Sequence, residues 1–166
     1  MAMTMNTEGL DDVSAMLAAL GNKAEETASA ALYDGAGVVA DALTRAVSSI
    51  YAEPQRKKNQ PPAKTPARWP TPEEKAALEG KIGIAKFSRN GSEVDTVVGV
   101  TGASGYAVIN GKRKPIREIA RSINSGTSFM HKQPVFRKAK NAATKPAQAA
   151  IIAKAEEKFN EIINGN

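Results

Sequence analysis

The sequence predicts an α+β protein in which a small antiparallel sheet packs against a long N-terminal helix and a C-terminal helix. Apolar residues recur with a period near 3.6 over residues 22–50 and again over 134–164, as in amphipathic helices. Asn90-Gly91 separates two short apolar runs within 82–100, which predicts a β-hairpin. The length of 166 residues suits a single domain over 1–166, with 53–70 as an extended Pro-rich basic loop or arm.

Three elements are expected before the arm. Residues 1–7 alternate weakly between apolar and polar, which predicts a short edge strand. Residues 10–20 carry Leu10, Val13, Met16, Leu17 and Leu20 at helical spacing. Asn22 is then a candidate N-cap, with Glu25 completing a capping box. The helix from there to about residue 50 has an Ala- and Gly-rich stripe, so we interpret it as a core helix, with a partner-helix surface as the alternative.

The arm is the most distinctive change of composition. Its prolines are Pro54, Pro61, Pro62, Pro66 and Pro70. Prolines at this density prevent regular helix or sheet and favour extended polyproline II structure. Trp69, the only tryptophan, stands at the end of the arm. It either pins the arm to the body of the same chain or docks on a neighbouring subunit.

The remaining elements have clear boundary signals. Thr71 and Glu74 form a capping box around Pro72, which predicts a short helix. Residues 106–109 form a third strand closed by Asn110-Gly111, and Pro115 opens a helix that Gly126 ends. The last helical region should be interrupted or kinked near 141–145, because Pro146 lies within it.

Charge is divided unevenly along the chain. Residues 1–50 have two basic and seven acidic side chains, a net of −5, whereas residues 111–145 have ten basic and one acidic, a net of +9. This polarity is typical of head-to-tail contacts between subunits, and equally of contact with nucleic acid. The subunit-interface candidates are Arg117, Arg121, Arg137, Lys138, Asp11, Asp12 and Trp69.

Residue patterns that would support catalysis are missing. The chain has no cysteine, and its single histidine, His131, has no partner nearby in sequence, which favours an isolated surface residue. The Glu73-Glu74 pair is interpreted as part of a solvated helix face. No phosphate-binding glycine loop, metal-ligand spacing or membrane span of about 20 apolar residues is present in the sequence. We therefore predict neither enzymatic activity nor a cofactor, metal or membrane contact.

One segment carries a family resemblance. It comprises Gly126-Thr127 and then Gln133, Pro134 and Phe136, and it follows a strand with Val98-Gly99-Val100. With the long Ala-rich first helix, this order resembles the tail-completion, or head–tail joining, family of long-tailed bacteriophages, also called "gp ten-like" tail components or neck proteins. Asn124-Ser125 stand where that family has an acidic residue and an aromatic.

The resemblance implies a structural virion protein at the neck, made in the host cytoplasm. It implies a ring of copies, expected to be a hexamer, between the head-side connector and the tail tube or tail terminator. Two alternatives stay open. The chain could be a small basic DNA-binding or architectural protein, since Lys112-Arg113-Lys114 and the neighbouring arginines could neutralise phosphates. It could also be another tail ring component, such as a tail terminator, and non-specific contact with DNA in the ring lumen would need only charge.

Overall fold

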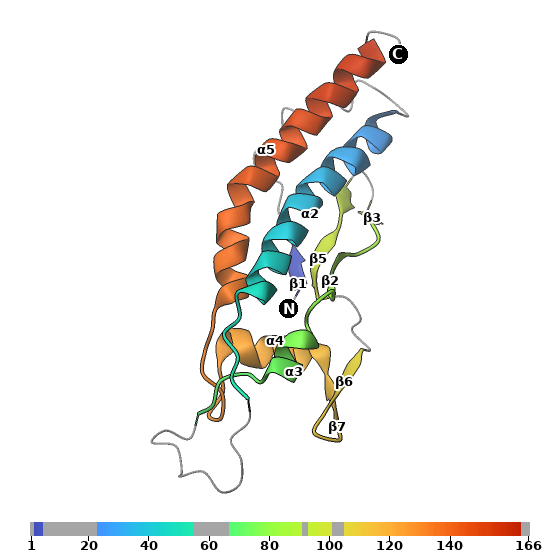
Figure 1. Cartoon of the computed structure of the whole chain (residues 1–166). Helices are drawn as coiled ribbons and strands as arrows, with labels where there is room; N and C mark the ends of the chain where they lie inside the picture. The colour runs from blue at the N-terminus through green and yellow to red at the C-terminus, as the bar shows by residue number, and fades with distance from the viewer. Residues whose placement is uncertain (1, 5–22, 55–66, 91–92, 101–104, 164–166) are drawn as a thin grey trace, which may run out of the picture.

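The structure is a computed structural model that describes residues 2–4, 23–54, 67–90, 93–100 and 105–163. Two long helices lie side by side, and small antiparallel sheets and two shorter helices lie against them and beyond their lower end (Figure 1). The predicted α+β class is confirmed. The predicted helix over 10–20, Asp11, Asp12 and most of the arm lie outside the described residues.

The long helices are α2 (Ala24–Ser48) and α5 (Val135–Ile163), and they form the most extensive contact between elements in the described chain. A glycine makes their close approach possible. A Cβ atom at Gly35 would lie 2.4 Å from Cγ1 of Ile151 and 3.1 Å from the carbonyl oxygen of Ala147. The small-residue stripe of α2 therefore packs within the core, as predicted.

Two details of these helices differ from expectation. The structure assigns the N-cap of α2 to Lys23, in helical conformation and without a side-chain capping bond, whereas Asn22, the predicted N-cap, lies outside the described residues. Helix α5 is continuous over 29 residues, so the predicted interruption before Pro146 is wrong. The predicted alternative, a kink, agrees with the bend of the α5 ribbon in Figure 1. Pro146 has no N–H, so the carbonyl oxygen of Ala142 lacks its usual helical donor. Both residues are exposed, so water can solvate that oxygen.

The main sheet has the order β1–β5–β2 and is antiparallel throughout. Strand β5 (Val97–Val100) pairs on one side with β1 (Ala2–Thr4), where Thr4 faces Val97, and on the other with β2 (Ile82–Ile84). Strands β3 (Ser88–Asn90) and β4 (Glu93–Asp95) extend the same hairpin as a separate pair. The hairpin over 82–100 and the N-terminal edge strand are both confirmed.

A second hairpin was only half predicted. Strand β6 (Tyr106–Ile109) pairs with β7 (Lys112–Pro115), a segment in which the sequence indicated only a basic run before a helix. Asn110 and Gly111 have φ values of 52° and 73°, which fits a two-residue hairpin turn. The strand was missed because Lys112-Arg113-Lys114 shows no apolar alternation.

The short helices match their boundary signals. Helix α3 (Pro72–Ala76) begins with the predicted capping box of Thr71 and Glu74. Helix α4 (Ile116–Ser125) buries its apolar stripe and ends at Gly126. The central core joins α2, α4, α5 and β5, and its larger members include Val39, Leu43, Val47, Leu78, Val98, Ile119, Ile123 and Phe136. Among the described residues, no helix is long and apolar enough to cross a membrane.

Candidate functional site: the joint and the base of the arm

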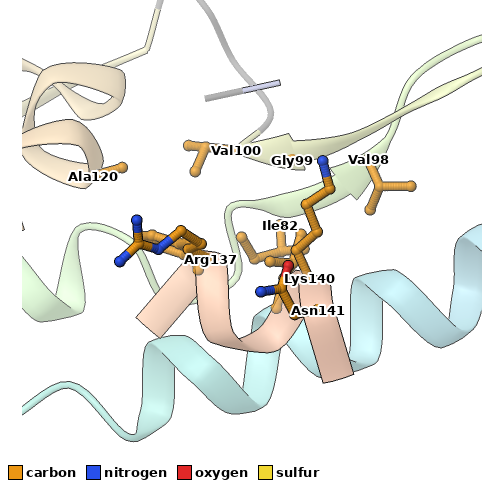
Figure 2. A pocket seen from close by; sticks show the side chains of 10 residues that line it. Ile82, Val98, Gly99, Val100, Ala120, Arg137, Lys140 and Asn141 are labelled. Carbon is orange, nitrogen blue, oxygen red and sulfur yellow. The ribbon is translucent and has the colours of Figure 1, made fainter. Parts of the chain in front are cut away.

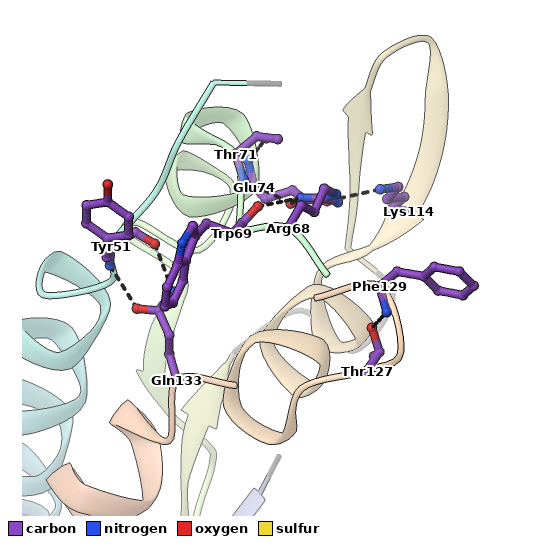
Figure 3. A network of polar contacts seen from close by, with 9 residues as sticks. All are labelled: Tyr51, Arg68, Trp69, Thr71, Glu74, Lys114, Thr127, Phe129 and Gln133. Carbon is purple, nitrogen blue, oxygen red and sulfur yellow. Dashed lines mark hydrogen bonds and ion pairs between the residues drawn. The ribbon is translucent and has the colours of Figure 1, made fainter. Parts of the chain in front are cut away.

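The joint between α4 and α5, residues 126–136, is a tightly bonded turn. Gly126 has φ 73° and donates its N–H to the carbonyl of Ser122 at 2.9 Å, which closes α4. Thr127 and Met130 exchange backbone hydrogen bonds of 3.0 and 3.3 Å. The N–H of Phe129 donates to Oγ1 of Thr127 at 3.2 Å (Figure 3). A side chain at position 126 would also collide with Lys132, because an added Cβ would lie 2.9 Å from its Cβ.

Gln133 fastens the joint to the end of α2. Its Oε1 accepts from the N–H of Tyr51 at 2.9 Å, and its Nε2 donates to the Tyr51 carbonyl at 2.8 Å (Figure 3). Its own N–H donates to the carbonyl of Ile123 at 2.8 Å. Gln133 thereby ties together α2, α4 and the start of α5, although Tyr51 is 82 residues away in sequence.

The two ends of the arm meet beside this joint. The N–H of Glu53 donates to the carbonyl of Pro70 at 2.9 Å, which brings the entry and exit of 55–66 together. Arg68 donates its N–H to Phe129 and accepts from the N–H of His131, both at 2.9 Å. The base of the arm is therefore an integral part of the joint.

Aromatic rings fill the space between the arm and the joint. The ring of Trp69 meets the ring of Tyr51 edge-on at 5.2 Å, and the ring of His131 lies 4.5 Å away at 36°. The interpretation of Trp69 as a pin within its own chain is confirmed. The prediction that His131 is an isolated surface residue is wrong, because the histidine is half-buried against this tryptophan.

Glu74 is the only buried carboxylate among the described residues and the centre of an ion cluster. Its two oxygens accept from both terminal nitrogens of Arg68, each at 2.7 Å, and from Nζ of Lys114 at 3.0 Å (Figure 3). The interpretation of Glu74 as a solvated residue is thus wrong. Burial raises the pKa of this carboxyl, but the bonds from Arg68, the Thr71 N–H and Lys114 outweigh burial and hold the pKa at about 2.

The cluster explains how distant segments are held in place. Arg68 leads out of the arm, Glu74 belongs to α3, and Lys114 belongs to the basic hairpin strand β7. One carboxylate therefore links the arm base, α3 and the β6–β7 hairpin. Sequence reasoning missed this cluster, since neither Arg68 nor Lys114 is marked by any motif, and Lys114 is 40 residues from its partner.

The other predicted site residues divide between core and surface. Phe136 is buried in the core, and Pro134 precedes the first residue of α5, with its carbonyl accepting from the N–H of Lys138 at 3.1 Å. The interface candidates Arg117 and Arg121 on α4, and Arg137 and Lys138 on α5, are all exposed.

The joint also displays one large apolar side chain. Phe129 is 72% exposed and points away from the polar network in Figure 3, although the turn that carries it is well bonded. The sequence pattern placed Phe129 in the joint but did not single it out.

The polar contacts of the joint and of the arm base link segments that are distant in sequence. In the part of the chain that the structure describes, no group of three or more His, Asp or Glu side chains is placed to hold a metal ion. The strongest electrostatic feature, Glu74, has its oxygens occupied by protein cations. Comparisons with protein-family models, with curated proteins and with solved structures found no match.

Proposed function

We propose that this protein is a structural virion component that forms a ring at the head–tail junction of a long-tailed phage. In this proposal each copy bridges the head-side connector and the tail tube or its terminator. Its role is geometric, so it acts by shape and contact and needs no cofactor.

The observation that carries the proposal is the construction of the joint. The residues that resemble the tail-completion family, Gly126, Thr127, Gln133, Pro134 and Phe136, each have a distinct structural role. Gly126 closes α4, Thr127 bonds the turn, and Gln133 links the end of α2 to the start of α5. The carbonyl of Pro134 accepts the first backbone bond of α5, from Lys138, and Phe136 enters the core. A resemblance limited to chance matches would not be expected to fall on such positions.

The distribution of charged residues also supports the proposed ring. Arg117, Arg121, Arg137 and Lys138 are exposed on α4 and α5, whereas residues 1–50 contain seven acidic and only two basic side chains. Ring closure requires heterologous contacts, in which one surface of a copy meets a different surface of the next. Opposite charges on two such surfaces favour the correct pairing over the alternatives.

A complementation experiment tests the function. The gene is inactivated in the phage that carries it, and variants are supplied from a plasmid. We expect filled heads and separate tails without the protein, and joined particles with the wild type. Arg117→Glu with Arg121→Glu should reduce joined particles, whereas the equally large reversal Lys23→Glu with Lys86→Glu, at two exposed lysines outside the basic region, should not. Normal particles without the protein would refute the proposal.

One observation favours DNA binding as the second candidate. The β6–β7 hairpin exposes Lys112 and Arg113, and the guanidinium of Arg113 lies 4.6 Å from the ring centre of the exposed Tyr106. Cations beside an exposed aromatic are typical of surfaces that bind nucleic acid backbones and bases. Tight, strongly salt-dependent binding of the free protein to duplex DNA would favour this function, and weak binding at physiological salt would favour the structural one.

A further inference from the structure

An apolar cavity of about 330 Å³ lies between the main sheet and the helices (Figure 2). Strands β2 and β5 and helices α2, α4 and α5 line it with Ile82, Val98, Val100, Leu43, Ala120 and Phe136. Within this apolar set, Ile82 and Val100 are half-buried and the others are buried. The cavity therefore reaches into the core and is deeper than a patch on the surface.

The register of the sheet explains the apolar floor of the cavity. Ile82 faces Val100 in the antiparallel pair of β2 and β5, so the two side chains lie on the same face of the sheet. Val98 lies two residues before Val100 in β5 and shares that face. All three residues pack in or against the hydrophobic core, so this face of the sheet is turned towards the helices.

One side of the cavity is cationic. Arg137, Lys140 and Asn141 line it from α5, and their spacing of i, i+3 and i+4 places them on one face of that helix. Figure 2 shows these polar side chains projecting from the same stretch of α5. Arg137 and Lys140 are exposed, so their charged ends reach water while their aliphatic stems border the apolar space.

The charges of these two cations are not used within the described chain. No carboxylate of the described residues forms an ion pair with Arg137 or Lys140. They differ in this from Arg68 and Lys114, whose charges meet Glu74. An anion that enters the cavity would therefore find two cations without a competing partner.

These features define a ligand by its chemistry. Small-molecule sites are typically cavities of about 300–1,000 Å³ with an apolar lining and a few polar groups that fix orientation. An apolar cavity of about 150 Å³ holds benzene, so about 330 Å³ holds roughly twice as many carbon atoms. The cations favour a negative charge at one end of the ligand, and a guanidinium group matches the geometry of a carboxylate.

We propose that the cavity binds a small anionic amphiphile, namely an aliphatic chain of roughly eight to twelve carbons that ends in a carboxylate. The chain lies over Val98 and Val100, and the carboxylate meets Arg137 and Lys140. A protein surface fits less well, because it would reach only the exposed side of the cavity. This binding activity goes beyond the proposed head–tail role and does not depend on it.

A titration of the full chain, followed by NMR of the backbone amides, tests the site. The probes are octanoate, octanol and octyltrimethylammonium, which share one chain length and differ in charge. We expect octanoate to bind saturably with a Kd below about 1 mM and to shift the amides of the cavity lining. Octanol should bind at least about tenfold more weakly, because it lacks the charge that meets the cations, and octyltrimethylammonium should not bind.

Substitutions separate the contact with the carboxylate from the contact with the chain. Arg137→Gln with Lys140→Gln should weaken octanoate binding at least about tenfold and leave octanol binding within about threefold. Lys138→Gln with Lys145→Gln changes two exposed lysines of α5 that do not line the cavity, and octanoate binding should stay within about threefold. Val100→Phe adds volume inside the cavity and should weaken both ligands. Circular dichroism checks that each variant is folded.

Several results would overturn the inference. They are octanoate shifts that do not saturate, shifts that fall away from the cavity lining, and octanol binding as tight as that of octanoate. Equal weakening of octanoate by the Arg137–Lys140 and Lys138–Lys145 substitutions would show a general effect of charge and would also overturn it. None of these results bears on the complementation experiment, so the binding site and the head–tail role stand or fall separately.

Discussion

Replacing Glu74 with glutamine should destabilise the protein by about 3 kcal/mol at neutral pH. The side chain is 2% exposed, and its carboxylate accepts from Arg68, Lys114 and the N–H of Thr71. The pKa of the Glu74 carboxyl falls from 4.5 to about 2 in the folded protein. Each pKa unit corresponds to about 1.4 kcal/mol, so a difference of roughly 2.5 units sets the scale of the expected loss of stability. Both cations retain access to water, which keeps the cost at the lower end of the range for breaking a buried ion pair.

The direction of the pKa change determines how the stability difference between wild type and variant depends on pH. A carboxyl whose pKa is depressed by folding contributes its full stabilisation above its unfolded pKa, and loses it as the pH falls through the folded pKa. With values of 4.5 and about 2, roughly 1.5 kcal/mol remains at pH 3 and almost nothing below pH 2. The difference in unfolding free energy between wild type and variant should therefore shrink between about pH 5 and pH 2.

Urea unfolding provides the assay, followed by the fluorescence of Trp69, the single tryptophan, which adjoins Arg68 in the chain. Glu73→Gln is the matched control, because Glu73 is the exposed neighbour in the same helix, and it should cost far less than Glu74→Gln. A loss below about 1 kcal/mol for Glu74→Gln, or a difference that does not change with pH, would refute the reasoning.

Two further substitutions test the packing of the helices and the joint. Gly35→Ala should destabilise the protein by about 1–3 kcal/mol in thermal unfolding, because its Cβ would collide with Ile151. Gly37→Ala is the control, since its Cβ would meet open space and the substitution should stabilise the helix slightly. Equal effects of the two substitutions would contradict the close approach of α2 and α5. Gln133→Ala should cost about 1–2 kcal/mol, since it removes both hydrogen bonds to the Tyr51 backbone, and a neutral result in urea unfolding would show that this tie is dispensable.

Local signals in the sequence predicted most elements because their causes are local. The Thr71 capping box and Gly126 each act through backbone conformation within a few residues, and the Asn90-Gly91 dipeptide predicted the hairpin in which Asn90 pairs with Glu93. The interruption predicted before Pro146 does not occur, because packing of α5 along α2 outweighs the loss of one exposed hydrogen bond. The continuity of α5 at Pro146 depends on its packing against α2, and the strength of that packing cannot be read from the sequence.

The centre of the candidate site depends on long-range contacts, which no single-sequence pattern reveals. Gln133 and Tyr51 are 82 residues apart, and Lys114 and Glu74 are 40 residues apart. The joint could still be selected from its Gly-Thr and Gln-Pro residues. Its role in closing the arm and holding α2 became clear only with the fold.

Imaging the virion tests the central claim most directly. Particles of the phage that carries this gene are labelled with antibody against the protein and viewed by electron microscopy. We predict label at the head–tail junction, and a ring there in an averaged map into which α2 and α5 fit. Label on the capsid shell or along the tail, or no label on complete particles with an antibody that detects the protein in the lysate, would contradict the account.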